Sequence, residues 1–322
     1  MPTVLVTAPY MIPYLDRFRP ILEKHGIELI VPEVEERLEE SELLEFAGQF
    51  DGTICGDDCY TKEVIKACSP RLKVISKWGT GIDSINKQAC EEFEIVLGNS
   101  PNAFTKAVAD SVLGYVLAFA RKGPWMDKEM KKGTWEKIGG RSLSECTLGV
   151  IGIGNIGKAV IQRAFPFEVA IFGTDIQEID PGFIEEHQVE MVSLEELLSK
   201  SDFVSVNCDL NPSSYHLINE DTLKLMNPSS VLINTARGPI VDEKALVEVL
   251  VDGKLAGAAL DVYEFEPLPD DSPLRDFENV LLAPHNSNSS PQAWENVHWN
   301  TIRNLFDGLG IIYDTNERGE IL

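Results

Sequence analysis

The stretch TLGVIGIGNIGKAV (residues 147–160) decides the fold. It begins with an apolar run typical of a buried strand, and residues 158–165 have the pattern of a helix. Gly152 permits the tight turn between them, Gly154 lets the backbone approach a pyrophosphate, and Gly157 lets the helix pack closely on the strand. Because a helix N-terminus also attracts negative charge, the stretch predicts a dinucleotide-binding turn. A glycine turn without a ligand is the alternative.

Asp175 ends the next predicted strand and indicates which dinucleotide binds. A carboxylate at this place accepts hydrogen bonds from both hydroxyls of the adenosine ribose, and it repels a 2′-phosphate. No Arg or Lys follows in Ile176-Gln177-Glu178. The strand, helix and acid together favour a ligand over an empty turn, and they predict NAD rather than NADP.

Short apolar runs alternate with amphipathic segments on both sides of this turn, a pattern typical of parallel sheets built from strand-helix-strand units. Strands are predicted at TVLVT (3–7), IELIV (27–31), GTIC (52–55), LKVIS (72–76), EIVLG (94–98), TLGVI (147–151), VAIFGTD (169–175), FVSVN (203–207), SVLINTA (230–236), AGAALDV (256–262) and NVLLAPH (279–285). Helices are predicted between them, for example at residues 14–25, 61–67 and 85–93. The fold class is therefore α/β, with two doubly wound, Rossmann-like parallel sheets.

Two long helical segments set the predicted domain boundaries. Residues 105–122 are largely apolar, so we expect them to be buried between the domains. Residues 291–309 are amphipathic, follow the last strand and are expected to pack back on the first domain. The prediction is one domain from residues 1–99 and 291–322, and a second from residues 100–290.

Composition excludes several classes of protein. The chain has 322 residues and a formal charge of -24, which disfavours binding to nucleic acid or to a membrane surface. No apolar run approaches the length of a membrane span, and the segment at residues 1–16 is expected to hold a first strand rather than a signal peptide. Its six cysteines form no C-x-x-C pair, which predicts free thiols in a reducing cytoplasm. No spacing of His and Cys indicates a metal site.

Three residues that follow predicted strands suggest a reaction. Arg237 follows SVLIN, Glu266 follows AGAAL and His285 follows NVLL, at the carboxyl ends where open α/β sheets bind ligands. An arginine fork suits a carboxylate or a 2-oxo acid, and a histidine exchanges a proton with a hydroxyl or ketone near neutral pH. A nearby carboxylate stabilises the charged histidine. Taken singly, each side chain also fits a structural role at the surface or the sheet rim.

These segments together make the chain resemble the D-isomer-specific 2-hydroxyacid dehydrogenases, in particular the phosphoglycerate-dehydrogenase-like group. The matching motifs are KWGTGID (77–83), PNA (101–103), GVIGIGNIGKAV (149–160), INTARGPIVDEKAL (233–246), GAALDVYEFEPLP (257–269) and LAPH (282–285). The resemblance implies a discontinuous substrate domain, a central NAD domain, a cleft between them and a homodimer. It also implies that Arg237 binds and polarises the substrate, that His285 is the acid/base and that Glu266 is its partner.

The same resemblance extends the predicted sites along the motifs. The predicted cofactor-binding residues are Gly152, Gly154, Asn155, Ile156, Gly157, Asp175, Cys208, Thr235, Ala236 and Asp261. The predicted substrate-binding residues are Lys77, Thr80, Gly81 and Asn102, with the backbone amides near Thr80 and Gly81 holding the substrate carboxylate. The expected reaction is hydride transfer between NAD(H) and a D-2-hydroxy acid/2-oxo acid pair.

The chain departs from the family pattern in places that bear on the substrate. Ser287 stands where a glycine usually follows the histidine, and Cys208-Asp209 replaces a frequent His/Thr-Pro. Gly56-Asp57-Asp58 stands where phosphoglycerate dehydrogenases place an arginine, and two carboxylates would repel a phosphate. The prediction is therefore a non-phosphorylated, polar 2-oxo acid, with Lys77 the nearest basic residue.

Two alternatives stay open at this point. One is a phosphite-type dehydrogenase on the same scaffold, and the other is an NAD-sensing binding protein similar to the corepressors that share it. A formate-type enzyme is disfavoured because those enzymes have Gln where Glu266 stands. The histidines His25, His187, His216 and His298 lie outside any motif and receive no predicted role in the reaction.

Overall fold

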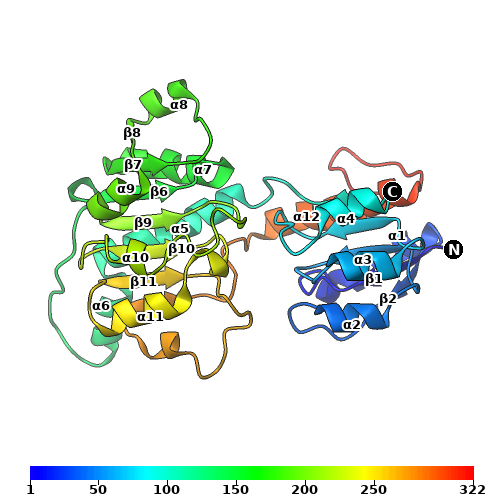
Figure 1. Cartoon of the computed structure of the whole chain (residues 1–322), viewed down its shortest axis with the longest axis horizontal. Helices are drawn as coiled ribbons and strands as arrows, with labels where there is room; N and C mark the ends of the chain where they lie inside the picture. Colours follow the sequence, from blue (N-terminus) through cyan, green and yellow to red (C-terminus); the bar gives the residue numbers. More distant parts are fainter. The chain divides into compact units, whose positions relative to one another are not determined.

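The computed structural model describes all 322 residues, and the chain divides into two compact units. Unit 1 comprises Met1–Phe104 and Ser290–Leu322, and unit 2 comprises Thr105–Ser289. Figure 1 shows the consequence for the chain path: unit 1 combines the blue N-terminal part with the orange and red C-terminal part, whereas unit 2 is one continuous stretch. None of the helices combines the length and the apolar character needed to cross a membrane.

Unit 1 is built on a five-stranded sheet in the order β2-β1-β3-β4-β5, and all of its strand pairs are parallel. Its central strands are buried along their whole length, as expected for a sheet covered on both faces. The strands are β1 (Thr3–Val6), β2 (Glu28–Ile30), β3 (Gly52–Cys55), β4 (Val74–Lys77) and β5 (Val96–Gly98). The helices are η1 (Ile12–Tyr14), α1 (Leu15–Lys24), α2 (Glu40–Glu45), α3 (Lys62–Cys68), α4 (Lys87–Glu92) and α12 (Pro291–Leu309).

Helix α12 is the C-terminal contribution to unit 1 and packs against β3, β4 and β5. Its apolar face is fully buried, including Ile302, Leu305 and Phe306. The contact with the sheet is close, because a Cβ added at Gly52 would lie 2.9 Å from Leu305. The buried Ser76 hydroxyl on β4 also donates to the backbone oxygen of Thr301, at 2.7 Å.

Unit 2 is built on a seven-stranded parallel sheet in the order β12-β11-β10-β9-β6-β7-β8. The chain leaves β6 through β7 and β8, and it then returns to the other side of β6 to form β9 to β12. The strands are β6 (Thr147–Ile151), β7 (Ala170–Thr174), β8 (Val189–Met191), β9 (Phe203–Val206), β10 (Val231–Asn234), β11 (Gly257–Leu260) and β12 (Val280–Leu282).

Helices cover both faces of this sheet and enclose two apolar cores. The helices of unit 2 are α5 (Thr105–Arg121), α6 (Gly123–Lys131), η2 (Leu143–Glu145), α7 (Asn155–Ala164), η3 (Phe165–Phe167), α8 (Pro181–Glu186), α9 (Leu194–Lys200), α10 (Glu220–Leu223), η4 (Gly238–Ile240), α11 (Glu243–Val251) and η5 (Pro273–Asp276). Helix α5 was expected between the domains, and this expectation needs correction. Its buried residues, such as Val112 and Val116, pack within the core of unit 2, where α5 lies against α7.

The predicted α/β class with two doubly wound, Rossmann-like sheets is confirmed. All of the predicted strands are present, and β8 lies outside the predicted set because its three residues are mostly exposed. Helix α7 already begins at Asn155, so that Gly157 lies in its first turn rather than before it.

A buried histidine links α12 to the sheet of unit 1. His298 is 3% exposed, and its Nδ1 accepts a hydrogen bond from Trp78 Nε1 at 3.0 Å. The ring packs among Tyr14, Phe18 and Trp78. Burial lowers the pKa of His298 from its ordinary value of 6.5 to about 4, so the ring is neutral in the folded protein.

We predict that this histidine makes folding sensitive to mild acid. Because its folded pKa lies below its unfolded value, the unfolded chain takes up the proton first, and stability falls as the pH drops from 6.5 towards 4. The expected loss between about pH 8 and about pH 5 is roughly 2 kcal/mol. Urea unfolding followed by tryptophan fluorescence measures it. His298→Asn keeps an acceptor near Nδ1 but cannot titrate, and an equally large loss in that variant would contradict the prediction.

Candidate cofactor and catalytic site

The predicted residues of unit 2 lie at one edge of its sheet, because all of its strands run parallel and their carboxyl ends meet there. The strand order reverses between β6 and its neighbours β7 and β9, which is the place where open α/β sheets bind dinucleotides. In sheet order, the edge carries His285 after β12, Glu266 after β11, Arg237 after β10, Cys208 after β9, Gly152 to Gly157 after β6, and Asp175 after β7.

The glycine turn after β6 has the backbone geometry that its spacing predicts. Gly152 has φ +85°, and a Cβ there would lie 2.6 Å from the backbone nitrogen of Cys208. A Cβ on Gly157 would lie 2.0 Å from the carbonyl oxygen of Gly152, which no side chain can tolerate. A Cβ on Gly154 would meet no atom within 4 Å, so the space beside the start of α7 is open. Two glycines are thus required by packing, whereas Gly154 leaves room for a ligand.

Asp175 lies directly beside this turn. Its Oδ2 accepts a hydrogen bond from the backbone nitrogen of Ile153 at 2.6 Å, and its Oδ1 accepts from that of Gln177 at 2.8 Å. The carboxylate is therefore fixed next to the glycine turn while it remains partly accessible. The residues that follow it, Ile176 to Glu178, are exposed and include no cation.

Buried polar atoms without a protein partner lie at the same edge. They include Thr235 Oγ1 after β10 and Asn288 Oδ1 in the loop after β12. An unsatisfied buried oxygen is costly, so it commonly marks a place where a polar ligand binds. Cys208 lies nearby, and burial raises the pKa of its thiol to about 11, which keeps it neutral and unreactive.

Glu266 and His285 form a hydrogen-bonded pair. Glu266 Oε2 lies 2.8 Å from His285 Nδ1, and Glu266 Oε1 accepts from the backbone nitrogen of Tyr263 at 2.9 Å. His285 has φ +49°, an uncommon left-handed conformation, and its backbone nitrogen donates to the carbonyl of Asp261. The backbone amide of Tyr263 thus fixes the Glu266 carboxylate, and Nε2 of His285 is the ring nitrogen that does not contact Glu266.

Asp261 fixes the loop that carries His285. It is 1% exposed, and its two carboxylate oxygens accept the backbone N–H groups of Asn286 and Ser287, at 2.7 and 2.8 Å. Its predicted contact with the cofactor stays a prediction. In the structure its carboxylate fixes the backbone of the loop that follows β12.

Arg237 precedes η4 and sits in a tightly packed loop. Asn234 Nδ2 donates to its carbonyl oxygen at 2.9 Å, and one Nη1–H of Arg237 donates to the carbonyl of Ala236 at 2.8 Å. The next residue, Gly238, lies against the Tyr263–Glu264 peptide so closely that an added Cβ would be 1.9 Å from the carbonyl of Tyr263. The loop of Arg237 therefore packs directly on the loop that carries Glu266.

The predicted substrate residues belong to unit 1. Thr80, which precedes Gly81, donates from Oγ1 to the carbonyl of Ser100 at 2.8 Å. Asn102 has a left-handed backbone conformation, with φ +63°. Lys77 is only 4% exposed, and its Nζ lies 3.0 Å from Asp57 Oδ1 and donates to the carbonyl of Trp78. Lys77 ends β4, and Thr80 and Gly81 lie in the loop that follows it; the charge of Lys77 is already matched by the carboxylate of Asp57.

The sequence led us to expect that the carboxylates of Asp57 and Asp58 would both face the substrate and repel a phosphate, but Asp58 does not. It is fully buried and accepts hydrogen bonds from Thr7 Oγ1, the Leu38 nitrogen and the Gly56 nitrogen, at 2.7, 2.7 and 2.8 Å. Burial raises the pKa of this carboxyl group. The expectation is wrong for Asp58, which holds the loop after β3 together instead of facing a ligand.

Comparison with known proteins identifies the family. The model of the D-isomer specific 2-hydroxyacid dehydrogenase NAD binding domain matches residues 113–287. A glyoxylate reductase of Thermofilum pendens is 39% identical over 271 residues, covering 82% of this chain and 80% of that protein. A D-3-phosphoglycerate dehydrogenase of Methanocaldococcus jannaschii is 39% identical over 72% of this chain and 44% of that protein. The crystal structure of a glyoxylate reductase from Paecilomyes thermophila is 28% identical, with a TM-score of 0.81 over 100% of this chain and 97% of that one.

The chain belongs to the D-isomer-specific 2-hydroxyacid dehydrogenase family. It is an NAD-dependent oxidoreductase, and NAD is its cofactor. The residues of unit 2 fit that cofactor on their own geometry, since Gly154 leaves open space at a helix N-terminus, Asp175 lies beside it, and Thr235 offers an unpartnered buried hydroxyl. Along the sheet edge these groups follow one another in the order Thr235 after β10, the glycine turn after β6 and Asp175 after β7.

Two polar residues of the dehydrogenase, His216 and Glu264, are not among the predicted site residues, although Glu264 lies within the motif at 257–269. His216 and Glu264 are hydrogen-bonded to each other at 2.9 Å, in loops that follow β9 and β11. The sequence offers one signal for them, since both lie after strands whose loops carry predicted site residues. No spacing rule connects residues that are so far apart along the chain.

The contrast between two glycines gives a prediction about cofactor binding. Gly154→Ala should fold normally, because its Cβ meets no protein atom, yet it should weaken NADH binding by at least about tenfold, because the methyl group occupies the ligand's space. Gly157→Ala should instead lower the melting temperature, because its Cβ collides with the Gly152 carbonyl. Thermal unfolding and NADH fluorescence titration measure both. Unchanged NADH affinity in a folded Gly154→Ala variant would contradict this assignment.

Proposed function

We propose that this dehydrogenase interconverts a small, non-phosphorylated 2-oxo acid and the corresponding D-2-hydroxy acid, with Arg237, Glu266 and His285 as its catalytic residues. The observation that carries the proposal is the 2.8 Å contact between His285 Nδ1 and Glu266 Oε2, in a loop packed against that of Arg237. Bound NADH supplies the hydride to C2 of the substrate.

The residues of this chain supply the proton and the charge. In reduction, protonated His285 donates from Nε2 to the carbonyl oxygen, because Nδ1 is engaged by Glu266. Glu266 stabilises the imidazolium and fixes the ring orientation, and its second oxygen is held by the Tyr263 amide. The guanidinium of Arg237 binds the 2-oxo acid and stabilises the negative charge that develops on oxygen. Oxidation reverses these steps and requires neutral His285.

Unit 1 is proposed as the substrate domain and unit 2 as the NAD domain. The backbone amides around Thr80 and Gly81 would hold the substrate carboxylate, with Asn102 nearby in the sequence motif. Lys77 would act by fixing this loop, because its ammonium group is buried against Asp57. We further propose a homodimer, on the family resemblance, in a cytoplasm whose reducing conditions suit six free cysteines.

The proposal that the substrate lacks a phosphate rests on the surroundings of Lys77. A phosphate needs an available cation or a bidentate arginine, and the charge of Lys77 is already neutralised by Asp57. The whole chain carries a formal charge of -24, which also disfavours a dianion. Two of the relatives above are glyoxylate reductases, while the third is a phosphoglycerate dehydrogenase, so direct competition between substrate types is informative.

NADH consumption with a panel of 2-oxo acids tests the substrate class. We expect kcat/KM for hydroxypyruvate or glyoxylate to exceed that for 3-phosphohydroxypyruvate by about tenfold or more, since the charge of Lys77 is already paired with Asp57. A value at least about tenfold higher for the phosphorylated compound would overturn the proposal. NAD-linked oxidation of phosphite, in a separate assay, would instead support the phosphite-type alternative.

The catalytic assignment predicts two distinct kinetic effects. His285→Ala should lose roughly 10²–10⁴-fold in kcat, the usual contribution of general acid–base catalysis, while still binding NADH. Glu266→Gln should move the midpoint of the reductive pH–rate profile to lower pH, because the charge that favours the imidazolium is gone. If the midpoint stays where it is in the unmodified enzyme, Glu266 is not the partner of the catalytic histidine.

A further inference from the structure

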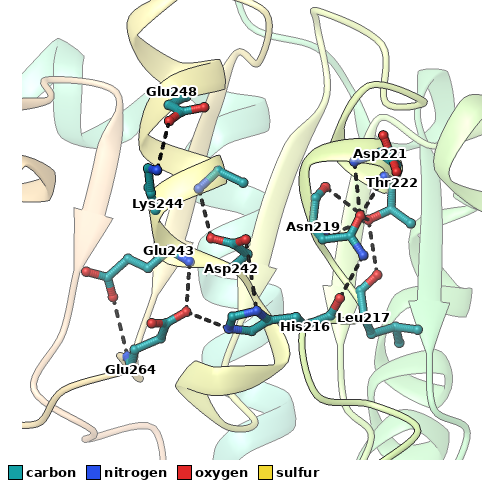
Figure 2. A network of polar contacts seen from close by, with 11 residues as sticks. His216, Leu217, Asn219, Asp221, Thr222, Asp242, Glu243, Lys244, Glu248 and Glu264 are labelled. Carbon is teal, nitrogen blue, oxygen red and sulfur yellow. Dashed lines mark hydrogen bonds and ion pairs between the residues drawn. The ribbon is translucent and has the colours of Figure 1, made fainter.

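His216 connects three loops at the carboxyl edge of the unit 2 sheet (Figure 2). It belongs to the loop after β9, has φ +48°, and its backbone nitrogen donates to the carbonyl of Pro239 in the loop after β10. Its Nε2 lies 2.9 Å from Glu264 Oε1 in the loop after β11. Its Nδ1 lies 3.9 Å from Asp242 Oδ2, at the N-cap of α11. His216 thus contacts the loop that carries Arg237 through its backbone and the loop that carries Glu266 through its ring.

Glu264 lies where those two loops meet. Its Oε1 also accepts the backbone N–H of Glu243 at the start of α11, at 3.1 Å, and its own backbone nitrogen donates to Glu243 Oε2 at 3.4 Å. The peptide between Tyr263 and Glu264 is the surface on which Gly238 packs. Any movement of the Glu264 backbone would therefore press on the residue next to Arg237 and shift the turn that ends at Glu266.

The charges around His216 explain why this link is needed. Asp242, Glu243 and Glu264 place three carboxyl groups at one corner of the sheet, and the His216 ring lies between two of them (Figure 2). Burial, together with the charge of Glu264, raises the pKa of Glu243. Neighbouring carboxylates repel one another. The His216 ring, which lies between Asp242 and Glu264, reduces this repulsion and keeps the two loops together.

We propose that His216 and Glu264 form a positioning pair that keeps the loops of Arg237 and Glu266 in register for proton and hydride transfer. The proposal rests on the catalytic roles proposed above for Arg237 and Glu266. The pair does not contact the glycine turn or Asp175, which lie after β6 and β7 on the other side of β9. Its loss should therefore reduce turnover and leave cofactor affinity nearly intact.

The kinetic test uses two variants of His216 and a matched control. His216→Phe, which keeps an aromatic ring and removes the side-chain hydrogen bond, should lower kcat roughly 10–100-fold, the scale expected when catalytic groups are misplaced by about 1 Å. The KM for NADH should stay within about twofold, and the midpoint of the reductive pH–rate profile should move towards that of Glu266→Gln. His216→Gln restores a donor and should recover most of kcat. Lys244→Ala, which removes an exposed ion pair with Glu248 on the same helix, should behave as the unmodified enzyme.

Amide hydrogen exchange supplies a readout that does not depend on activity. In His216→Phe, exchange should become faster for residues 236–240 and 263–266 and stay unchanged for residues 152–157. The proposal is overturned if exchange in those two loops is unchanged, or if kcat of the folded His216→Phe enzyme stays within about twofold of normal. A failure of the unmodified enzyme to reduce any 2-oxo acid would instead refute the proposed function, and hydrogen exchange would still decide whether the pair positions the loops.

Discussion

Parallel pairing of every strand in unit 2 is the constraint on which the site depends. Because each strand ends at the same edge, loops that are far apart in the sequence become neighbours in the order of the strands. The chain therefore needs no long insertion to assemble a site, only a polar residue after each of several short strands. Reversal of the strand order beside β6 then leaves the space in which a dinucleotide fits.

A set of carboxylates that accept backbone N–H groups turns this arrangement into fixed geometry. Asp175 holds the glycine turn, Asp261 holds the His285 loop, Glu266 is held by Tyr263, and Glu264 joins the start of α11. These amides lie in turns beyond the ends of strands or, for Glu243, in the first turn of α11, where the backbone has no partner in a strand ladder or within the helix. Some of the acidic residues of the chain thus stabilise its loops, because an ionised carboxylate accepts a stronger hydrogen bond than a neutral group does.

Much of this could be predicted from the sequence, for reasons that are local. The glycine spacing between an apolar run and a helix is a short-range property, and the predicted roles of Gly152 and Gly157 in packing agree with the close contacts found. The strands were predictable because strands buried on both faces are nearly continuous apolar runs. The start of α7 was placed late, because Asn155 and Ile156 carry no helix signal of their own.

Contacts between distant loops lie beyond such reasoning. Lys77 is predicted as a ligand contact from its motif, yet only the fold places Asp57 against it and buries both Lys77 and Asp58. His216 has no motif, and its importance comes from Glu264, a residue on another strand's loop. The residue type determines which contacts a side chain can make, but only the folded structure determines which residue lies close enough to make them.

The discontinuity of unit 1 has a consequence for how the chain is made. Unit 2 is a single continuous segment, so all of its core is available before synthesis ends. The strands of unit 1 leave the ribosome before unit 2 does, but α12, whose Leu305 and Phe306 are fully buried, leaves it after unit 2. During translation, strands β3, β4 and β5 therefore lack the helix that packs against them until unit 2 has been made. Synthesis of unit 1 thus begins before that of unit 2, but unit 2 can be completed before unit 1.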